Sequence, residues 1–340
     1  MELMDHIGQK TVLFDSHVAL NAKMVSFGGY KMPISYSQGI QSEYFAVRKS
    51  VGIFDVSHMG EFTIKGDNAL QFLQEVTIND VSKLNIGYAQ YSAMCYEDGG
   101  IIDDLILYRT HDGYLMVVNA SNIQKDYDWL CKHIDGDVNL EDISSNISLV
   151  ALQGPKSREL LATFTDANLK MPFYTFEETT VCGYSVILSR TGYTGELGFE
   201  IYASKEAIIP IWDDLRNAGA QPAGLAARDI LRMEMAYCLY GNDIDNKTNP
   251  VEAGLSWITA LDKKEYIGLE KILEEKTGGP KRRLVAFKML ERGIPRQGYG
   301  VFIEEKNVGY VTSGTQSPSL NAGIGLAYID SPSNQTGQHI

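Results

Sequence analysis

The chain has 340 residues, a length that suits about two domains with a large buried core and excludes a peptide hormone or a disulfide-stapled miniprotein. Hydrophobic residues make up 44% and charged residues 21%, which is ordinary for a globular protein and excludes a disordered or fibrous chain. The formal net charge of −13 disfavours non-specific nucleic-acid binding, so we expect a small-molecule or protein partner and no nucleic acid.

The cysteines and the N-terminus bear on the compartment. Cys95, Cys131, Cys182 and Cys238 lie far apart and form no C-x-x-C pair, so free thiols are expected and no zinc or redox motif. Residues 1–6 lack a basic region followed by an apolar one, which predicts no secretory signal. No apolar run approaches the ~20 residues that cross a bilayer. We therefore expect a cytoplasmic protein without a membrane partner.

The first part of the chain alternates between helices and strands. Helices are predicted after Leu13 through Ala22 and over 38–49, with a turn at 27–33 between them. From Gly60 the order is close to the split β-α-β module with one extra strand. Its expected elements are strand 61–65, helix 68–76, strands 88–96, 101–109 and 114–119, helix 122–133 and strand 137–143.

A second, similar series begins at residue 147. It comprises strand 148–153, a helix opened by Pro155, strands 180–189 and 196–202, and helix 205–218. A helix over 225–240 that Gly241 stops and an Asn- and Asp-rich loop over 242–249 follow. Beyond the Thr-Gly-Gly-Pro at 277–280, short β runs at 284–289, 300–303, 308–312 and 324–328 predict a small β-barrel or sandwich. Residues 331–340 show no periodicity and are expected to fray.

Two aspartates stand inside an apolar strand after the hairpin turn Asp98-Gly99-Gly100. A carboxylate beside apolar groups has a raised pKa unless donors meet it, and is a candidate catalytic group. The other interpretation is an edge-strand charge and a turn cap. Strand alternation does not decide between the two aspartates. It places Asp103 with Ile101 and Leu105, and Asp104 with Ile102, Ile106 and Tyr108.

The glycine-rich segment 190–201 has neither the dinucleotide-binding spacing nor a terminal Gly-Lys-Ser, which excludes nucleotide binding. Glu196, Gly198 and Glu200 share one face of the strand that follows. One interpretation is a solvated acidic face. The functional alternative is that Gly198 lets a planar ligand approach while Glu200 accepts two parallel hydrogen bonds from an amidine-like edge, such as that of a pterin.

Three further signals concern charge and metals. Arg228 falls in the first turn of the helix expected from 225, where the helix dipole disfavours a cation, so Asp229 or a ligand anion should compensate. His58 has no Cys or carboxylate partners at ligand spacing, and no metal site is expected. The absence of a G-x-S-x-G motif argues against a serine hydrolase.

Five segments together resemble the T-protein family, the aminomethyltransferases of the glycine cleavage system. They are F-D-V-S-H-M-G-E at 54–61, G-G-I-I-D-D at 99–104, S-R-T-G-Y-T-G-E at 189–196, P-A-G-L with R-D over 222–229, and T-N-P at 248–250. The resemblance extends in family order from about 14 to 328. It implies an α+β, multidomain folate-binding T-protein fold around a central channel. We expect a catalytic region of two interleaved α+β subdomains over 1–276, ferredoxin-like at about 56–145, a small C-terminal β-barrel over 277–330, and a disordered tail over 331–340.

The same resemblance implies the activity and the site. The enzyme would take the aminomethyl group from the lipoyl arm of H-protein and, with tetrahydrofolate as acceptor, give 5,10-methylenetetrahydrofolate and ammonia. The family's essential aspartate falls on Asp104, and its folate-contacting carboxylate and arginine fall on Glu200 and Arg228. The other implied folate-pocket residues are Met59, Tyr91, Tyr108, Asn119 and Tyr193, with Tyr108 and Tyr193 as aromatic walls.

Two departures from the family pattern carry expectations of their own. The last residues, 331–340, do not resemble the family's terminal strands, so we expect a truncated barrel that lacks a folate-contacting arginine. Folate polyglutamates and H-proteins are anionic, so an acidic chain needs a basic rim at the channel mouth. The candidates are Arg190, Lys281, Arg282, Arg283, Arg292 and Arg296. The alternatives to an aminomethyltransferase are a free-standing folate-dependent demethylase of another small methyl donor and a non-catalytic folate-binding protein, against which Asp104 counts.

Overall fold

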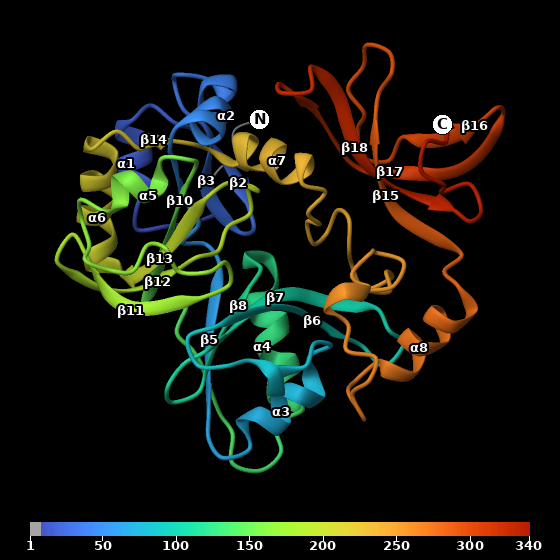
Figure 1. The fold of residues 1–340 in the computed structure, drawn as a ribbon, viewed down its shortest axis with the longest axis horizontal. Helices are drawn as coiled ribbons and strands as arrows, with labels where there is room; N and C mark the ends of the chain where they lie inside the picture. The colour runs from blue at the N-terminus through green and yellow to red at the C-terminus, as the bar shows by residue number, and fades with distance from the viewer. Residues whose placement is uncertain (1–7) are drawn as a thin grey trace.

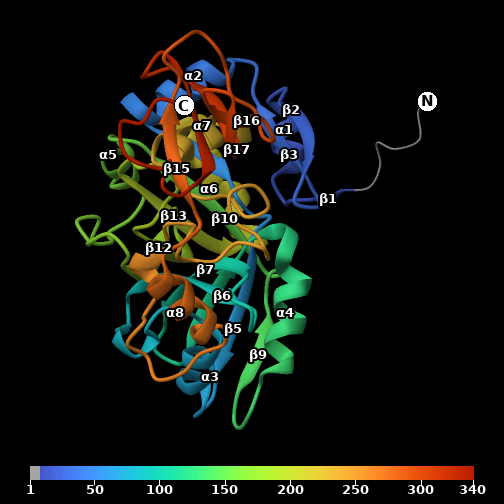
Figure 2. The same ribbon diagram turned by 90° about the vertical axis from the view of Figure 1, so that its right-hand side faces the viewer.

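The computed structural model describes residues 8–340, so the expectation about residues 1–6 lies outside the described residues. Figure 1 shows three groups of elements around a central region. The first, at upper left, combines the N-terminal elements with those from β10 (Ile147–Gln153) to α7 (Leu225–Glu234). The second is the cyan and green group below, and the third is the red sheet at upper right. Figure 2 shows the last two groups at opposite ends of the molecule.

The second group is the ferredoxin-like module. Its elements are β5 (Gly60–Lys65), α3 (Ala69–Val76), β6 (Ala89–Cys95), β7 (Ile101–Arg109), β8 (Tyr114–Val118), α4 (Ile123–Lys132) and β9 (Asn139–Asp142). The strand order β6-β7-β8-β5-β9 is that of the split β-α-β module with β6 added at one edge, which confirms the prediction. Apolar residues at helical spacing on α3, such as Phe72, Leu73 and Val76, bury one face of the helix in the core of this module.

The first group repeats this plan, as the sequence indicates. Its sheet has the order β11-β12-β13-β10-β4-β14, so β11 occupies the edge position that β6 has in the other sheet, and β4 is inserted beside β10 from an earlier part of the chain. The two units are therefore interleaved. The elements are β4 (Gly52–Asp55), β10 (Ile147–Gln153), α5 (Ser157–Leu161), β11 (Phe176–Val181), β12 (Tyr184–Ser189), β13 (Gly198–Ser204), α6 (Lys205–Asn217) and β14 (Gln221–Pro222).

The N-terminal elements cover this sheet and correct one prediction. They are β1 (Gln9–Lys10), α1 (Phe14–Ala19), β2 (Lys23–Phe27), β3 (Tyr30–Ser35) and α2 (Ile40–Lys49). The turn expected over 27–33 is only two residues long, because Gly28 and Gly29 adopt φ of 55° and 83° and join β2 directly to β3.

Three other elements differ from their predicted bounds. The strand expected over 180–189 is a hairpin of β11 and β12, with its turn at Cys182 and Gly183 (φ 53° and 81°). The helix expected to reach Tyr240 is α7 (Leu225–Glu234), which ends six residues earlier. Pro155 precedes α5 by two residues and does not lie in its first turn. The sequence analysis also missed the 3-10 helix η3 (Ser256–Ile258) and the helix α8 (Leu269–Gly278).

The third group is an antiparallel sheet of order β15-β18-β17-β16, which agrees with the short β runs expected after residue 280. The strands are β15 (Arg282–Lys288), β16 (Gly300–Ile303), β17 (Lys306–Ser317) and β18 (Ala322–Asp330). Residues 331–340 form neither helix nor strand. The domain limits expected near 56, 145, 277 and 331 stay predictions. Over residues 8–340, none of the helices has the length and apolar character needed to span a membrane.

A buried polar network fixes the end of β4, from which the chain enters the centre of the molecule. The Asp55 carboxylate accepts hydrogen bonds from the Thr11 hydroxyl (2.7 Å) and the Ser57 amide (2.9 Å) and contacts Nε2 of His17 at 2.9 Å. The Tyr36 hydroxyl lies 2.9 Å from Nδ1 of the same ring. Burial alone would raise the pKa of Asp55, but the His17 contact together with the Ser57 and Thr11 hydrogen bonds outweighs it and lowers that pKa.

Asp55→Asn is expected to lower the free energy of unfolding at pH 7 by about 2–4 kcal/mol, because it leaves the buried His17 without its carboxylate. The folded-state pKa of Asp55 lies below the unfolded value, so its contribution is complete above about pH 5 and is lost as the pH falls toward the folded-state pKa. Urea unfolding at pH 7 and pH 3.5 measures both effects. The exposed Asp15→Asn is the control, and equal losses in the two variants would contradict the prediction.

Candidate active site

A cavity of about 490 Å³ lies in the central region, where the ferredoxin-like sheet meets the interleaved sheet. Its walls come from β6, β7 and β8, from β13, from the segments after β4 and α7, and from the loops before β11 and before η3. Seven of the eight residues that the sequence analysis assigned to the site line it. They are Met59, Tyr91, Asp104, Asn119, Tyr193, Glu200 and Arg228.

A β-bulge decides which aspartate reaches this cavity. Pairing between β6 and β7 joins Met94 to Asp103 and Cys95 to Ile101, so Ile102 is an extra residue on β7. Ile102 therefore packs in the same core as Leu105, and the predicted sharing of a face between Asp103 and Ile101 is wrong. Beyond the bulge the alternation holds, and Asp104 lines the cavity while Asp103 is buried behind it.

Asp104 is held by two hydrogen-bond donors. The Tyr91 hydroxyl donates to its Oδ2 and Nδ2 of Asn119 donates to its Oδ1, each at 2.8 Å. Burial, together with the negative charge of Asp103, raises the pKa of Asp104 to about 7, although the two donors oppose that change. A carboxyl group with this pKa can hold or release a proton at neutral pH.

Glu200 lines the cavity from β13 of the interleaved sheet and is almost fully buried. The Thr191 hydroxyl donates to its Oε2 at 2.5 Å. Burial raises the pKa of Glu200, whereas the Thr191 hydrogen bond and the charge of Arg228 lower it. Glu196 and Gly198, which were expected to share a strand face with Glu200, do not join it at the cavity. Glu196 pairs with Arg48 at 2.9 Å, and Gly198 does not line the cavity. A Cβ at Gly198 would lie 2.3 Å from the Gln153 side chain, so this glycine makes room for Gln153 and not for a ligand.

Arg228 contributes the positive charge of the cavity. Its guanidinium lies 4.6 Å from the centre of the Tyr193 ring. Burial lowers the pKa of Arg228, and Tyr193 and Glu200 partly offset that effect. One alternative expected Asp229 to compensate the charge of Arg228. It does not, because Asp229 pairs with Arg232 at 2.8 Å. Among residues 8–340, no side chain forms a hydrogen bond with the Arg228 guanidinium, which is therefore available to an anionic or acceptor group.

Tyr108 is the one assigned residue that does not line the cavity, which corrects its expected role as an aromatic wall. Its ring is fully buried, and its hydroxyl lies 2.9 Å from the Tyr202 hydroxyl and 3.3 Å from Oγ1 of Thr191. Tyr202 lines the cavity in its place. Since Thr191 also bonds Glu200, Tyr108 supports the position of Glu200 from behind.

Several lining residues were missed in the sequence analysis. Tyr237 stacks on Tyr193 with ring centres 5.7 Å apart, and Trp257 lies 5.8 Å from the Tyr91 ring while 69% of it is exposed. His58 also lines the cavity, and burial, with the charge of Arg228, lowers its pKa to about 4, so the ring is neutral. No local pattern marks these positions, because only the tertiary fold brings them to one cavity. Within residues 8–340 no cluster of His, Cys, Asp and Glu is suited to a metal ion.

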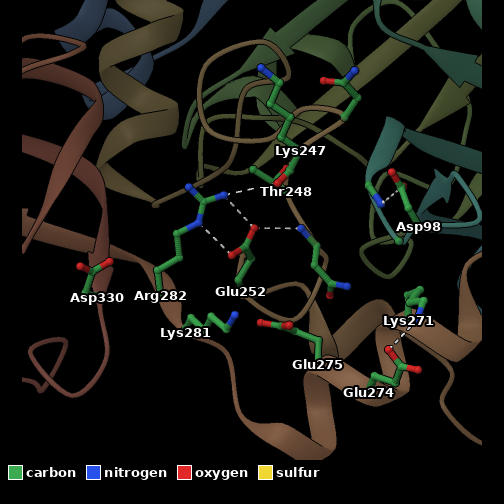
Figure 3. Close-up of a pocket in the computed structure, with 14 residues that line it drawn as sticks. Asp98, Lys247, Thr248, Glu252, Lys271, Glu274, Glu275, Lys281, Arg282 and Asp330 are labelled. Carbon is green, nitrogen blue, oxygen red and sulfur yellow. Dashed lines mark hydrogen bonds and ion pairs between the residues drawn. The ribbon is translucent and has the colours of Figure 1, made fainter.

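A second hollow, of about 540 Å³, lies between the tip of the β6–β7 hairpin, α8 and the start of β15 (Figure 3). It is lined by charges of both signs, and Arg282 is committed to Glu252 through bonds of 2.9 and 3.0 Å. Lys281 and Arg282, two of the residues expected to form a basic rim, face this hollow. Among residues 8–340, none of the six basic candidates lines the 490 Å³ cavity, and the basic rim at the channel mouth stays a prediction.

The cavity fits a reduced folate by size and chemistry. Its volume of about 490 Å³ lies within the usual range for small-molecule sites of roughly 300–1,000 Å³. Aromatic rings line it, and a buried carboxylate and a free guanidinium face it, which suits a flat heterocycle with a donor edge and an acceptor.

Comparisons with known proteins agree with this chemistry. Residues 13–263 match the family model described as the GCVT N-terminal domain, and residues 282–340 match that of the glycine cleavage T-protein C-terminal barrel domain. The aminomethyltransferase of Flavobacterium psychrophilum is 50% identical over 329 residues, covering 94% of this chain and 91% of the relative. That of Halothermothrix orenii is 47% identical over 327 residues, with coverages of 94% and 91%.

A solved structure extends the similarity to three dimensions. The glycine cleavage system aminomethyltransferase T of Bartonella henselae superposes with a TM-score of 0.92 at 32% sequence identity, covering 97% of this chain and 92% of that one. The expected α+β T-protein fold with its C-terminal barrel domain is thereby confirmed. The chain belongs to the T-protein family, the aminomethyltransferases of the glycine cleavage system.

Proposed function

We propose that the 490 Å³ cavity is the place where this aminomethyltransferase brings tetrahydrofolate to the aminomethyl group. The enzyme class and the use of tetrahydrofolate follow from family membership. Neither alternative, a demethylase of another methyl donor or a non-catalytic folate-binding protein, is favoured by relatives that are aminomethyltransferases at 47–50% identity. The observation that carries the proposed site is that Asp104, with a pKa near 7, faces the same cavity as Glu200 and Arg228.

Glu200 and the aromatic side chains are proposed to orient the pterin ring. The Thr191 hydroxyl occupies Oε2 of Glu200, and the carboxylate presents its remaining acceptor positions to the cavity. A carboxylate binds two parallel N–H donors well, and the amino-pyrimidinone edge of a pterin has that pattern. Tyr193, Tyr237 and Tyr202 would enclose the ring, and Arg228 would bind an acceptor group beside it.

Asp104 is proposed as the catalytic residue. Tetrahydrofolate, when bound, supplies the amine nitrogens that accept the methylene carbon. The ionised Asp104 would stabilise positive charge that develops on those amines, and its Oδ2 would accept a proton from them. Tyr91 and Asn119 fix the carboxylate through bonds of 2.8 Å, so little reorganisation accompanies the reaction. The enclosing walls also exclude water and hold the two substrates in contact.

H-protein is proposed as the carrier that delivers the aminomethyl group on its lipoyl arm. The matched C-terminal domain family and the Bartonella henselae structure are both named for the glycine cleavage system. Four exposed apolar side chains also line the cavity and support an entry for an apolar arm; they are Phe27, Phe173, Met235 and Trp257. The test mixes the purified chain with aminomethyl-loaded H-protein and tetrahydrofolate and follows ammonia release. A demethylase or a passive binder would release none.

Glu200→Gln is expected to weaken tetrahydrofolate binding by about 10–100-fold, because a glutamine cannot accept two parallel hydrogen bonds and carries no charge. Isothermal titration of tetrahydrofolate into the protein measures the change in Kd. Glu196→Gln is the matched control, since Glu196 lies four residues away and pairs with Arg48 outside the cavity. An equal effect of the two substitutions would remove Glu200 from the binding site.

A further inference from the structure

Two more carboxyl groups lie in contact behind Asp104. Asp103 on β7 and Asp126 on α4 are both fully buried, and their carboxyl groups are within hydrogen-bonding reach of each other. Within residues 8–340, neither oxygen of Asp126 meets a hydrogen-bond donor. Nζ of Lys125 lies 3.7 Å from Oδ1 of Asp126, too far for a hydrogen bond, and donates to the carbonyl oxygen of Ile102 at 2.5 Å. Two ionised carboxylates in this position would repel each other strongly.

Asp103, in contrast, is surrounded by donors. The backbone amide of Asn119 donates to it at 3.0 Å, Nδ2 of Asn119 at 2.8 Å and Nδ2 of Asn122 at 2.7 Å. Burial raises the pKa of Asp103, but these three donors oppose that change, whereas Asp126 has none within the described part of the chain. A proton shared by the pair therefore resides on Asp126. That proton turns the contact into a hydrogen bond from Asp126 to Asp103 and gives Asp126 a partner. Burial and the neighbouring charge of Asp103 raise the pKa of Asp126 to about 11.

Asn119 connects this pair to the cavity. Its Nδ2 donates to Oδ1 of Asp103 and to Oδ1 of Asp104, each at 2.8 Å. The three carboxyl groups are therefore arranged in one hydrogen-bonded series from α4 through β7 to the cavity. A negative charge on Asp103 opposes ionisation of Asp104, which is why burial is not the only cause of the raised pKa of Asp104.

We propose that Asp126 is a positioning residue that permanently carries a proton, donates a hydrogen bond to the Asp103 carboxylate, and thereby keeps Asp103 ionised beside the catalytic Asp104. The inference rests on the proposed role of Asp104 and extends it to a residue that does not line the cavity. Other titratable groups face the series without sharing its proton. They are Lys125, Tyr96 and Tyr240 near Asp126 and Asp103, and Tyr91, Tyr174, Tyr193 and Cys238 near Asp104.

Infrared spectroscopy of the full chain tests the proton on Asp126 without any substrate. Carboxylic acids and carboxylates absorb at different frequencies, so a buried protonated carboxyl group is visible at pH 8. We expect an acid band at pH 8 that Asp126→Asn removes and Asp98→Asn retains. Glu61→Gln is the matched control, because burial raises the pKa of Glu61 as well. This variant should lose the acid band of Glu61 and keep that of Asp126. Retention of the whole acid absorption in Asp126→Asn would overturn the proposal.

The pH dependence of turnover tests the coupling to Asp104. In the wild-type enzyme, kcat is expected to rise with pH as Asp104 ionises near pH 7, and this rise is the acid limb of the pH profile. Asp126→Asn keeps a neutral donor beside Asp103, so the midpoint of the acid limb should stay near pH 7. Asp126→Leu removes the donor that lowers the pKa of Asp103, so burial then favours uptake of a proton from solvent by Asp103. The limb should therefore move down by about one pH unit or more. Asp103→Asn removes the charge directly and should move it in the same direction, which covers the case that the leucine variant does not fold. A limb unmoved in Asp103→Asn would overturn the coupling. A wild-type chain without turnover would contradict the proposed function, while the infrared result would still decide the proton on Asp126.

Discussion

Replacement of Asp104 by asparagine is expected to lower kcat by about 10²–10⁴-fold and to change the Kd for tetrahydrofolate by less than about threefold. Asparagine has nearly the same shape and can still accept the hydrogen bond that Tyr91 donates at 2.8 Å. It cannot carry the negative charge or accept a proton. The binding contacts at Glu200 and Arg228 lie on other elements and remain. The loss should therefore appear in the chemical step.

Ammonia release from aminomethyl-loaded H-protein gives kcat, and isothermal titration gives Kd. In the wild-type enzyme, kcat should rise as the pH increases through about 7, because ionisation of Asp104 produces the active form. That rise should be missing in Asp104→Asn. Asp98→Asn is the control on the same hairpin, since Asp98 is exposed and, within residues 8–340, its carboxylate accepts a hydrogen bond only from the turn amide of Gly100, at 3.0 Å. Unchanged turnover in Asp104→Asn would exclude Asp104 from the mechanism.

The position of Asp104 shows what strand alternation can and cannot predict. Beyond the bulge alternation holds, because Ile106 and Tyr108 pack in one core cluster and Leu105 and Leu107 in another. At the bulge it fails, since Ile102 adds one residue to β7 that β6 does not match. A bulge depends on how the partner strand pairs, and the alternation within β7 alone does not reveal that pairing. The resemblance to the family chose Asp104 where alternation left both aspartates open.

The end of α7 illustrates a second limit. The pattern over 225–240 suits a continuous helix, yet α7 ends at Glu234 and Ala236 adopts φ of 56°. The buried Arg232 side chain explains this difference, because its Nη1 donates to the carbonyl oxygen of Tyr237 at 2.9 Å while the Tyr237 amide bonds the Arg232 carbonyl oxygen at 3.0 Å. These hydrogen bonds of the buried Arg232 thus outweigh helix propensity, and the segment after α7 becomes a cavity wall.

Local sequence predicts the modules better than the site between them. The order of the ferredoxin-like strands and the repeat after residue 147 follow from periodicity alone. The cavity walls instead combine residues such as Tyr174, Tyr237 and Trp257, which are far apart in the chain. Tyr108 was misplaced for the same reason, because a strand's pattern gives the face of a residue but not whether another ring, here Tyr202, lies in front of it.

A buried ion pair joins α7 to the C-terminal sheet and anchors the cavity wall that the segment after α7 forms. Nη1 of Arg232 lies 2.6 Å from Oδ2 of Asp243, and both side chains are almost fully buried. Oδ1 of Asp243 accepts hydrogen bonds from Thr312 (2.5 Å) and Ser313 (2.7 Å) on β17, and its Oδ2 accepts one from the Leu239 amide at 3.0 Å. The carboxylate therefore links three segments of the chain.

Asp243→Ala is expected to lower the free energy of unfolding by about 3–5 kcal/mol, because it leaves the Arg232 guanidinium buried without its charge partner. Asp229→Ala is the matched control, since Asp229 binds the same guanidinium at 2.8 Å but its side chain is 44% exposed. That variant should lose about 1 kcal/mol or less. Urea unfolding measures both. Equal losses of unfolding free energy in the two variants would contradict the prediction that the buried Arg232–Asp243 pair contributes more than the Arg232–Asp229 pair. Because Leu239 lines the cavity and its amide bonds Asp243, Asp243→Ala should also weaken tetrahydrofolate binding, whereas Asp229→Ala should not.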